Sequence, residues 1–136
     1  MTEENTFLFE LVSPDAILAS ETVKMVTVPG EAGDFGVLAK HAPLLSSIRP
    51  GVVEITSENG DVKRLFVDGG FADVNETQCT VLAENATDVA DLNISDLEKE
   101  LEGLNKDLNS TEDDAQKSAR ITQQITIVQE KLKAAA

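Results

Sequence analysis

The residue types best suited to chemistry gather in one stretch, VPGEAGDFGVLAKHAPLL, over residues 28–45. It contains the single histidine of the chain, His41, and two carboxylates, Glu31 and Asp34. A histidine beside an acid can form the orienting pair of acid–base or nucleophilic catalysis, and histidine with carboxylates can hold a metal ion. However, no nucleophile-elbow motif surrounds the two serines that follow, and the spacing of the three side chains matches no metal-ligand motif. We therefore predict no catalytic residue and no metal site in this stretch.

The same stretch is rich in residues with special backbone geometry. Glycine supplies positive φ angles where other residues are strained, and proline fixes φ near its turn value. The glycines are spaced by three and lack the Lys-Ser/Thr ending of a phosphate loop. We assign them, with a proline and a second glycine pair, to turn geometry: Gly30, Gly33, Gly36, Pro43, Gly69 and Gly70. A turn specified this strongly is expected to be presented to a partner.

Composition narrows the class of partner. The chain has 136 residues and a formal net charge of −14, with acidic residues in excess in both halves. This field disfavours unassisted binding to nucleic acid or to an anionic membrane. The single cysteine, Cys79, excludes an internal disulfide and lies in an apolar pattern, where we expect it to pack as a small hydrophobe. Without a signal segment or an apolar run of about 20 residues, the chain is predicted to be cytoplasmic, with any membrane association through a partner.

Alternating apolar and polar residues predict β-structure over the first part of the chain. The expected strands cover residues 7–12, 16–19, 23–28, 44–48, 52–56, 62–67, 71–74 and 78–83. Asn59-Gly60 predicts a hairpin with a type I′ turn. Short strands with frequent turn signals are typical of a sandwich. We therefore predict an antiparallel two-layer β-domain over residues 1–86.

The pattern changes after residue 86, and residues 87–136 predict two antiparallel helices. Ser95 and Glu98 fit a capping box at the start of the first helix. Apolar residues then recur at steps of three and four on both helices, and the side chains expected to pack are Leu97, Leu101, Leu104, Ile125, Val128 and Leu132. Burying so narrow a line of apolar side chains offsets little of the conformational entropy that is lost when two helices become ordered. We expect the hairpin to need docking, on its own β-domain or on a partner, and to be able to release.

Several motifs together resemble one known family. In the glycine-rich stretch they are Val28-Pro29-Gly30, Gly33-Asp34-Phe35-Gly36-Val37-Leu38 and His41-Ala42-Pro43-Leu44-Leu45. Elsewhere they are Phe9-Glu10-Leu11-Val12-Ser13-Pro14, Arg49-Pro50-Gly51 and Val67-Asp68-Gly69-Gly70-Phe71. The chain resembles the epsilon subunits of bacterial F-type ATP synthases over essentially its whole length. It departs from the family at Ala39-Lys40, where Pro-Gly is usual.

The resemblance implies a fold and a role. It implies a β-sandwich of about ten strands followed by two helices, in a non-catalytic subunit of the central stalk. The β-domain is expected to bind the gamma subunit and the c-ring, coupling proton-driven rotation to ATP synthesis at the cytoplasmic face of the bacterial inner membrane. Glu31, Asp34 and His41 match the family region that faces the polar loops of the c-ring. Those loops carry basic residues, so an acid at position 34 is electrostatically suitable.

The resemblance also assigns a regulatory role to the hairpin, which in the family can extend toward the alpha and beta subunits of the catalytic head and inhibit ATP hydrolysis. Some members bind ATP through a hairpin motif, but Ser95-Asp96-Leu97-Glu98-Lys99-Glu100 departs from it at most defined positions. We therefore expect no cofactor. Two other readings remain: an acidic β-domain adaptor, which leaves the glycine-rich stretch unexplained, and a small esterase-like or metal-dependent enzyme, which lacks a buildable site.

Overall fold

Alternation of apolar and polar side chains places one face of each strand against a shared core. The computed structural model describes residues 5–111 and 113–136, and the chain separates into two units between Asp88 and Val89. The described part of the first unit has nine strands: β1 (Phe7–Val12), β2 (Ile17–Gly30), β3 (Gly33–Leu38), β4 (Leu44–Ile48), β5 (Gly51–Ser57), β6 (Val62–Val67), β7 (Gly70–Val74), β8 (Gln78–Leu82) and β9 (Ala86–Asp88). The predicted all-β domain followed by two helices is confirmed.

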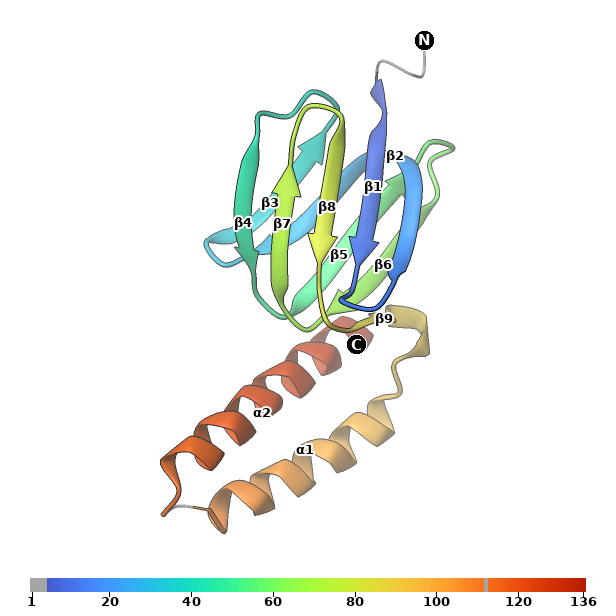
Figure 1. The fold of residues 1–136 in the computed structure, drawn as a ribbon. Helices are drawn as coiled ribbons and strands as arrows, with labels where there is room; N and C mark the ends of the chain where they lie inside the picture. Colours follow the sequence, from blue (N-terminus) through green and yellow to red (C-terminus); the bar gives the residue numbers. More distant parts are fainter. Residues whose placement is uncertain (1–4, 112) are drawn as a thin grey trace. The chain divides into compact units, whose positions relative to one another are not determined.

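The strands form two layers that β2 joins. Hydrogen bonding follows the order β1-β8-β7-β4-β2-β5-β6-β9, with β3 beside β2 and a further pairing of β1 with β2. One layer therefore contains β4, β7, β8 and β1, and the other contains β3, β5, β6 and β9 (Figure 1). All pairings are antiparallel except β1 with β8, which run parallel. The extra pairing along β2 leaves few unpaired edges at this side of the sandwich.

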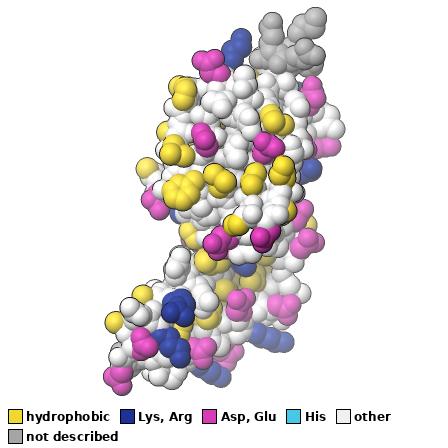
Figure 2. Space-filling view, viewed as in Figure 1, with side chains coloured by type: hydrophobic (Ala, Val, Ile, Leu, Met, Phe, Trp, Pro, Cys, Tyr) yellow, Lys and Arg dark blue, Asp and Glu magenta, His cyan; other side chains and the backbone are white. Residues whose placement is uncertain are grey.

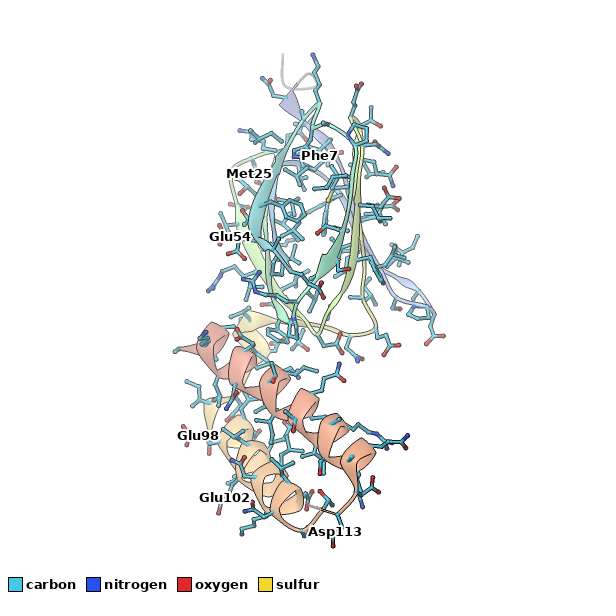
Figure 3. The ribbon with its side chains drawn as sticks, turned by 90° about the vertical axis from the view of Figure 1, so that its left-hand side faces the viewer. Phe7, Met25, Glu54, Glu98, Glu102 and Asp113 are labelled. Atoms are coloured by element: carbon cyan, nitrogen blue, oxygen red, sulfur yellow. The ribbon has the colours of Figure 1, made fainter. Side chains whose placement is uncertain are left out.

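The core lies between the two layers, as the edge-on view in Figure 3 shows. It is built mainly from aliphatic side chains, with Phe9 fully enclosed. Cys79 lies in this core as predicted, without contact to solvent. Burial, with a smaller contribution from the charge of Asp73, raises the pKa of the Cys79 thiol to about 12. The cysteine is therefore a packing residue that stays protonated at neutral pH.

Two predicted details of the strands are wrong. The strands predicted over residues 16–19 and 23–28 are parts of one strand, β2, which begins at Ile17 and which Glu21 does not end. Its carboxylate is only partly buried and accepts a hydrogen bond from Lys63 Nζ at 3.3 Å. The glycine-rich stretch, predicted as a turn, contributes strand β3 as well. A charged residue is tolerated in a strand where its side chain has a partner, as Glu21 has in Lys63. A glycine is tolerated where its backbone pairs with a neighbouring strand, as in β3.

The hairpin at Asn59-Gly60 forms, but with a different turn. Gly60 has φ +93°, whereas no positive φ occurs at Asn59. Gly60 N–H donates to Ser57 O at 2.9 Å and Ser57 N–H donates to Asp61 O at 2.8 Å, which defines a three-residue loop. Asn59 Oδ1 accepts from Asp61 N–H at 3.1 Å. The predicted type I′ turn is therefore wrong, because Asn59 bonds the following backbone without adopting positive φ.

The second unit contains a short helix η2 (Val89–Asp91) and two long ones, α1 (Ile94–Asn109) and α2 (Ala115–Ala135). Asn93 caps α1, since its Oδ1 accepts from Asp96 N–H at 3.0 Å, and the predicted capping box at Ser95 is wrong. Asp114 caps α2 in the same way. The expected packing residues divide into a buried group (Leu97, Ile125 and Val128) and a half-buried group (Leu101, Leu104 and Leu132), and Ile121 is buried as well.

Candidate functional site

The glycine-rich stretch folds into a β-hairpin with a two-residue tip. Gly30 at the end of β2 pairs with Gly33 at the start of β3, leaving Glu31 and Ala32 as the turn. Gly33 has φ +135°, and a Cβ on Gly30 would lie 2.8 Å from Gly33 O. Both positions therefore require glycine, one for its conformation and the other for close backbone approach. The hairpin presents the Glu31-Ala32 tip, with Asp34 beside it.

Arg49, directly after β4, connects the tip to the rest of the sandwich. Its Nη1 donates to Gly30 O at 2.6 Å, and its Nη2 donates to Asp34 Oδ1 at 2.5 Å. Its backbone N–H donates to Pro29 O at 2.9 Å, and Glu31 N–H donates to Ser47 O at 3.0 Å. The tip is thus hydrogen-bonded through both side chain and backbone. Sequence reasoning missed Arg49 in this role, because only folding brings position 49 beside position 34.

The two acids at the tip have different surroundings. Asp34 is paired with Arg49, and the two side chains are 60% and 43% exposed. Glu31 is exposed, and within residues 5–111 and 113–136 its carboxylate has no ion-pair partner. A paired carboxylate and guanidinium present a weaker field than an isolated charge. The unpaired negative charge of the tip is therefore that of Glu31.

His41 does not lie at the tip. It follows β3, whose six residues run roughly 20 Å away from Gly33. Lys40, at φ +63°, donates its N–H to Glu76 O at 3.0 Å, which places this connection beside the β7–β8 turn. His41 Nδ1 lies 2.7 Å from Ala42 O and carries the proton, since a carbonyl only accepts. The structure thus brings Glu31 and Asp34 together and separates His41 from both.

The remaining residues assigned to turn geometry have distinct surroundings. Gly69, between β6 and β7, has φ +120°, and Gly70, the first residue of β7, has φ +142°. A Cβ on Gly70 would overlap Leu82 O. Gly36 lies within β3, where a Cβ would approach Met25 Cε to 2.8 Å, so it serves side-chain packing and not a turn. Pro43 is exposed in the connection before β4.

A line of apolar side chains crosses the outer face of the neighbouring strands β7, β8, β1 and β2. The strand registers place Phe71 beside Leu82, Leu82 beside Val12, and Val12 beside Ile17. Phe71 is 53% exposed and Ile17 62% exposed. Figure 2 shows hydrophobic side chains along this face, and we call these four residues the apolar row. Exposed contiguous apolar surface of this kind marks interaction sites.

The arrangement suits recognition by shape and charge. In the described part of the chain, no three His, Cys, Asp or Glu side chains gather closely enough to hold a metal ion. The sandwich instead offers two surface features: a hydrogen-bonded acidic tip and the apolar row. The row was missed by sequence reasoning because it depends on the pairing of β1 with β8, which are far apart in sequence.

Comparison with known proteins gives consistent results. The family model for the ATP synthase delta/epsilon chain β-sandwich domain matches residues 6–89. The ATP synthase epsilon chain of Rhodospirillum centenum is 45% identical over 123 residues, covering 87% of this chain and 84% of that one. The epsilon chain of Rhodospirillum rubrum is 46% identical over 110 residues, covering 81% and 82%.

Solved structures resemble the fold as well. A chain in the mitochondrial ATP synthase of Euglena gracilis, described as OSCP/F1/c-ring in rotational state 1, superposes with a TM-score of 0.83 at 25% identity, covering 96% of this chain and 81% of that one. A chain in the central stalk/c-ring structure of the Tetrahymena thermophila mitochondrial enzyme shares the fold, with a TM-score of 0.65 at 14% identity, covering 96% of each chain. Sequence and fold agree over both units, and the chain belongs to the epsilon-chain family of ATP synthase.

Proposed function

We propose that this chain is a non-catalytic central-stalk subunit of an F-type ATP synthase. It couples rotation of the proton-driven c-ring to ATP synthesis in the catalytic head. The observation that carries this proposal is identity of 45% to an epsilon chain across most of both lengths. The match to a chain within an ATP synthase assembly that contains the c-ring supports it.

The apolar row supports the gamma subunit as the partner of the β-domain. A stalk subunit needs a stable neighbour on the rotor, and the cores of stable interfaces are depleted of charge and rich in large apolar residues. The apolar row has this character, with Phe71 at one end and Ile17 at the other. It therefore provides the area on which gamma docks.

The acidic tip supports the c-ring as the second partner. Glu31 and Asp34 present carboxylates at a tip held by Arg49. Basic residues on the ring's polar loops are the complement that such a tip requires, and complementary charge fixes register more than it adds affinity. His41 lies apart from this tip and is not included in the proposed contact.

The complex gives the chain a peripheral place at the cytoplasmic face of the bacterial inner membrane. In the described residues, no helix has the length and apolarity to cross a bilayer. The helical hairpin is the regulatory arm, which on extension contacts the alpha and beta subunits. Its division from the sandwich as a separate unit and its narrow buried seam support this role.

Co-purification with a tagged gamma subunit tests the proposal. Wild-type chain is expected to co-purify, whereas Phe71→Glu places a charge in the apolar row and is expected to reduce the recovered complex at least about tenfold. Val62→Glu is the matched control, because Val62 is 55% exposed against 53% for Phe71 but lies on β6 of the other layer. Failure of the wild-type chain to bind gamma would contradict the stalk function. If Phe71→Glu and Val62→Glu are recovered with gamma in equal amounts, the apolar row is not the surface that binds gamma.

A further inference from the structure

Arg49 makes more contacts than an ordinary surface cation. Its two terminal nitrogens reach acceptors on different strands, Gly30 O on β2 and Asp34 Oδ1 on β3. Its own backbone follows β4 and is hydrogen-bonded to Pro29 O. One residue thus joins three strands at the base of the tip. By contrast, the surface pair of Lys63 with Glu21 has a single contact of 3.3 Å.

The chemistry of guanidinium explains this arrangement. Its planar fork can serve two acceptors at once, whereas the ammonium of a lysine is a single point donor. Gly30 has no side chain that could hold the tip in place. A larger residue cannot replace it, because a Cβ at this position would lie 2.8 Å from Gly33 O and 2.9 Å from the Phe35 ring. The fork of Arg49 supplies what the glycines cannot, a fixed geometry for the Glu31-Ala32 turn.

We propose that Arg49 is a positioning residue for the c-ring contact. Arg49 holds the tip in place and neutralises the charge of Asp34, so that the net negative charge of the tip is that of Glu31. Asp34 then acts through Arg49 and not by touching the ring's cations itself. This inference rests on the proposed function, in which the tip faces the ring. It changes the role expected for Asp34 from a recognition charge to the anchor of the arginine.

The first test needs only the isolated protein. Glu31 N–H donates to Ser47 O, so its hydrogen exchange reports whether the tip is held. Arg49→Ala is expected to accelerate exchange at Glu31 about three- to tenfold, because a half-exposed charged pair contributes modestly. Amides of the core strands should remain unchanged, and Lys63→Ala, the matched control, should leave Glu31 unaffected. Unchanged Glu31 exchange in Arg49→Ala would overturn the proposal.

The second test uses the assembled enzyme, with proton-driven ATP synthesis measured against ionic strength. Glu31→Gln is expected to lower synthesis and flatten its salt dependence, because it removes the screened charge itself. Arg49→Ala and the double variant Arg49→Ala/Asp34→Ala should be impaired equally, since Asp34 acts through Arg49. Arg49→Lys, which retains one contact of the two, should recover part of the synthesis.

The outcomes separate this inference from the function on which it rests. If Asp34→Asn costs more synthesis than Glu31→Gln, or if the Arg49 and Asp34 losses add, Asp34 is itself the recognition charge and the inference is wrong. If all tip variants assemble with gamma and couple normally, the tip has no contact with the ring. If the wild-type chain restores no synthesis to an enzyme lacking it, the proposed function fails instead.

Discussion

The β-sandwich encloses its apolar side chains between two layers, whereas the helical hairpin covers its own along one narrow seam. Phe9, Val26 and Val53 in the sandwich have no contact with solvent. In the hairpin, Leu97 is the one buried residue of α1, opposite three on α2. The difference follows from geometry, because each strand of a sandwich is covered by neighbours and a facing layer, but each helix of a pair has a single neighbour. We therefore expect the sandwich to be the more stable unit and the hairpin to open more readily.

The largest expected difference between the two units is in thiol reactivity. Cys79 is buried and its pKa is raised to about 12, so a neutral-pH thiol reagent should react with it about a thousandfold or more slowly than with the unfolded chain. A cysteine introduced at the exposed Ala119 on α2 should react at the free rate. Stopped-flow labelling measures both. Fast labelling of Cys79 in the native protein would show that the sandwich also opens readily.

The raised pKa of Cys79 also predicts how stability depends on pH. Above about pH 9 the thiol of the unfolded chain ionises, while the folded thiol stays protonated up to about pH 12. The sandwich should therefore lose stability as pH rises through this window. Cys79→Ser, compared by urea unfolding at pH 8 and pH 10, should reduce that loss.

Adding one methyl group to a glycine should have opposite effects in the two units. Gly70→Ala drives a Cβ into Leu82 O at φ +142° and should destabilise the sandwich by about 3 kcal/mol or more. Gly103→Ala in α1 meets open space and should stabilise the hairpin by about 0.5–1 kcal/mol. Urea unfolding with separate probes in each unit measures the two changes. A tolerated Gly70→Ala would contradict the close packing of β7 on β8.

A matched pair of core truncations tests whether the units unfold independently. Ile55→Ala in the sandwich and Ile125→Ala in α2 each remove the same atoms from a buried site, at about 2–4 kcal/mol. The first should accelerate hydrogen exchange of the strands, and the second only that of the helices, because Ile55 and Ile125 belong to different units. Acceleration of strand exchange by Ile125→Ala would show that the sandwich depends on the hairpin.

Helix capping gives a small effect and concerns the hairpin alone. Asn93→Ala removes the acceptor of Asp96 N–H and should destabilise α1 by about 1 kcal/mol. Ser95→Ala, at the position that sequence reasoning favoured, should change it little. Helix content followed by circular dichroism on heating distinguishes the two. An equal effect of both variants would restore a role for Ser95.

Local patterns were sufficient for the order of the two units, a β-domain followed by two helices. Alternation identified most of the strands but not β3 or β9, and apolar steps of three and four identified both helices, because each pattern reflects how a single element meets its core. The burial of Cys79 followed from the same pattern. Errors arose where neighbouring side chains changed the outcome, as with Glu21 inside β2 and the cap of α1.

The candidate site was identified less completely. Sequence alone indicated that the glycine-rich stretch is shaped for presentation, since glycine and proline act locally through φ, and it indicated acids at its tip. Only the tertiary structure decided that Arg49 pairs with Asp34, that β3 carries His41 away from the tip, and that residues 12, 17, 71 and 82 form one row. These features depend on strand register and strand order. Register and order are set by hydrogen bonding between segments that are distant in sequence, and a local sequence pattern does not indicate which segments will pair.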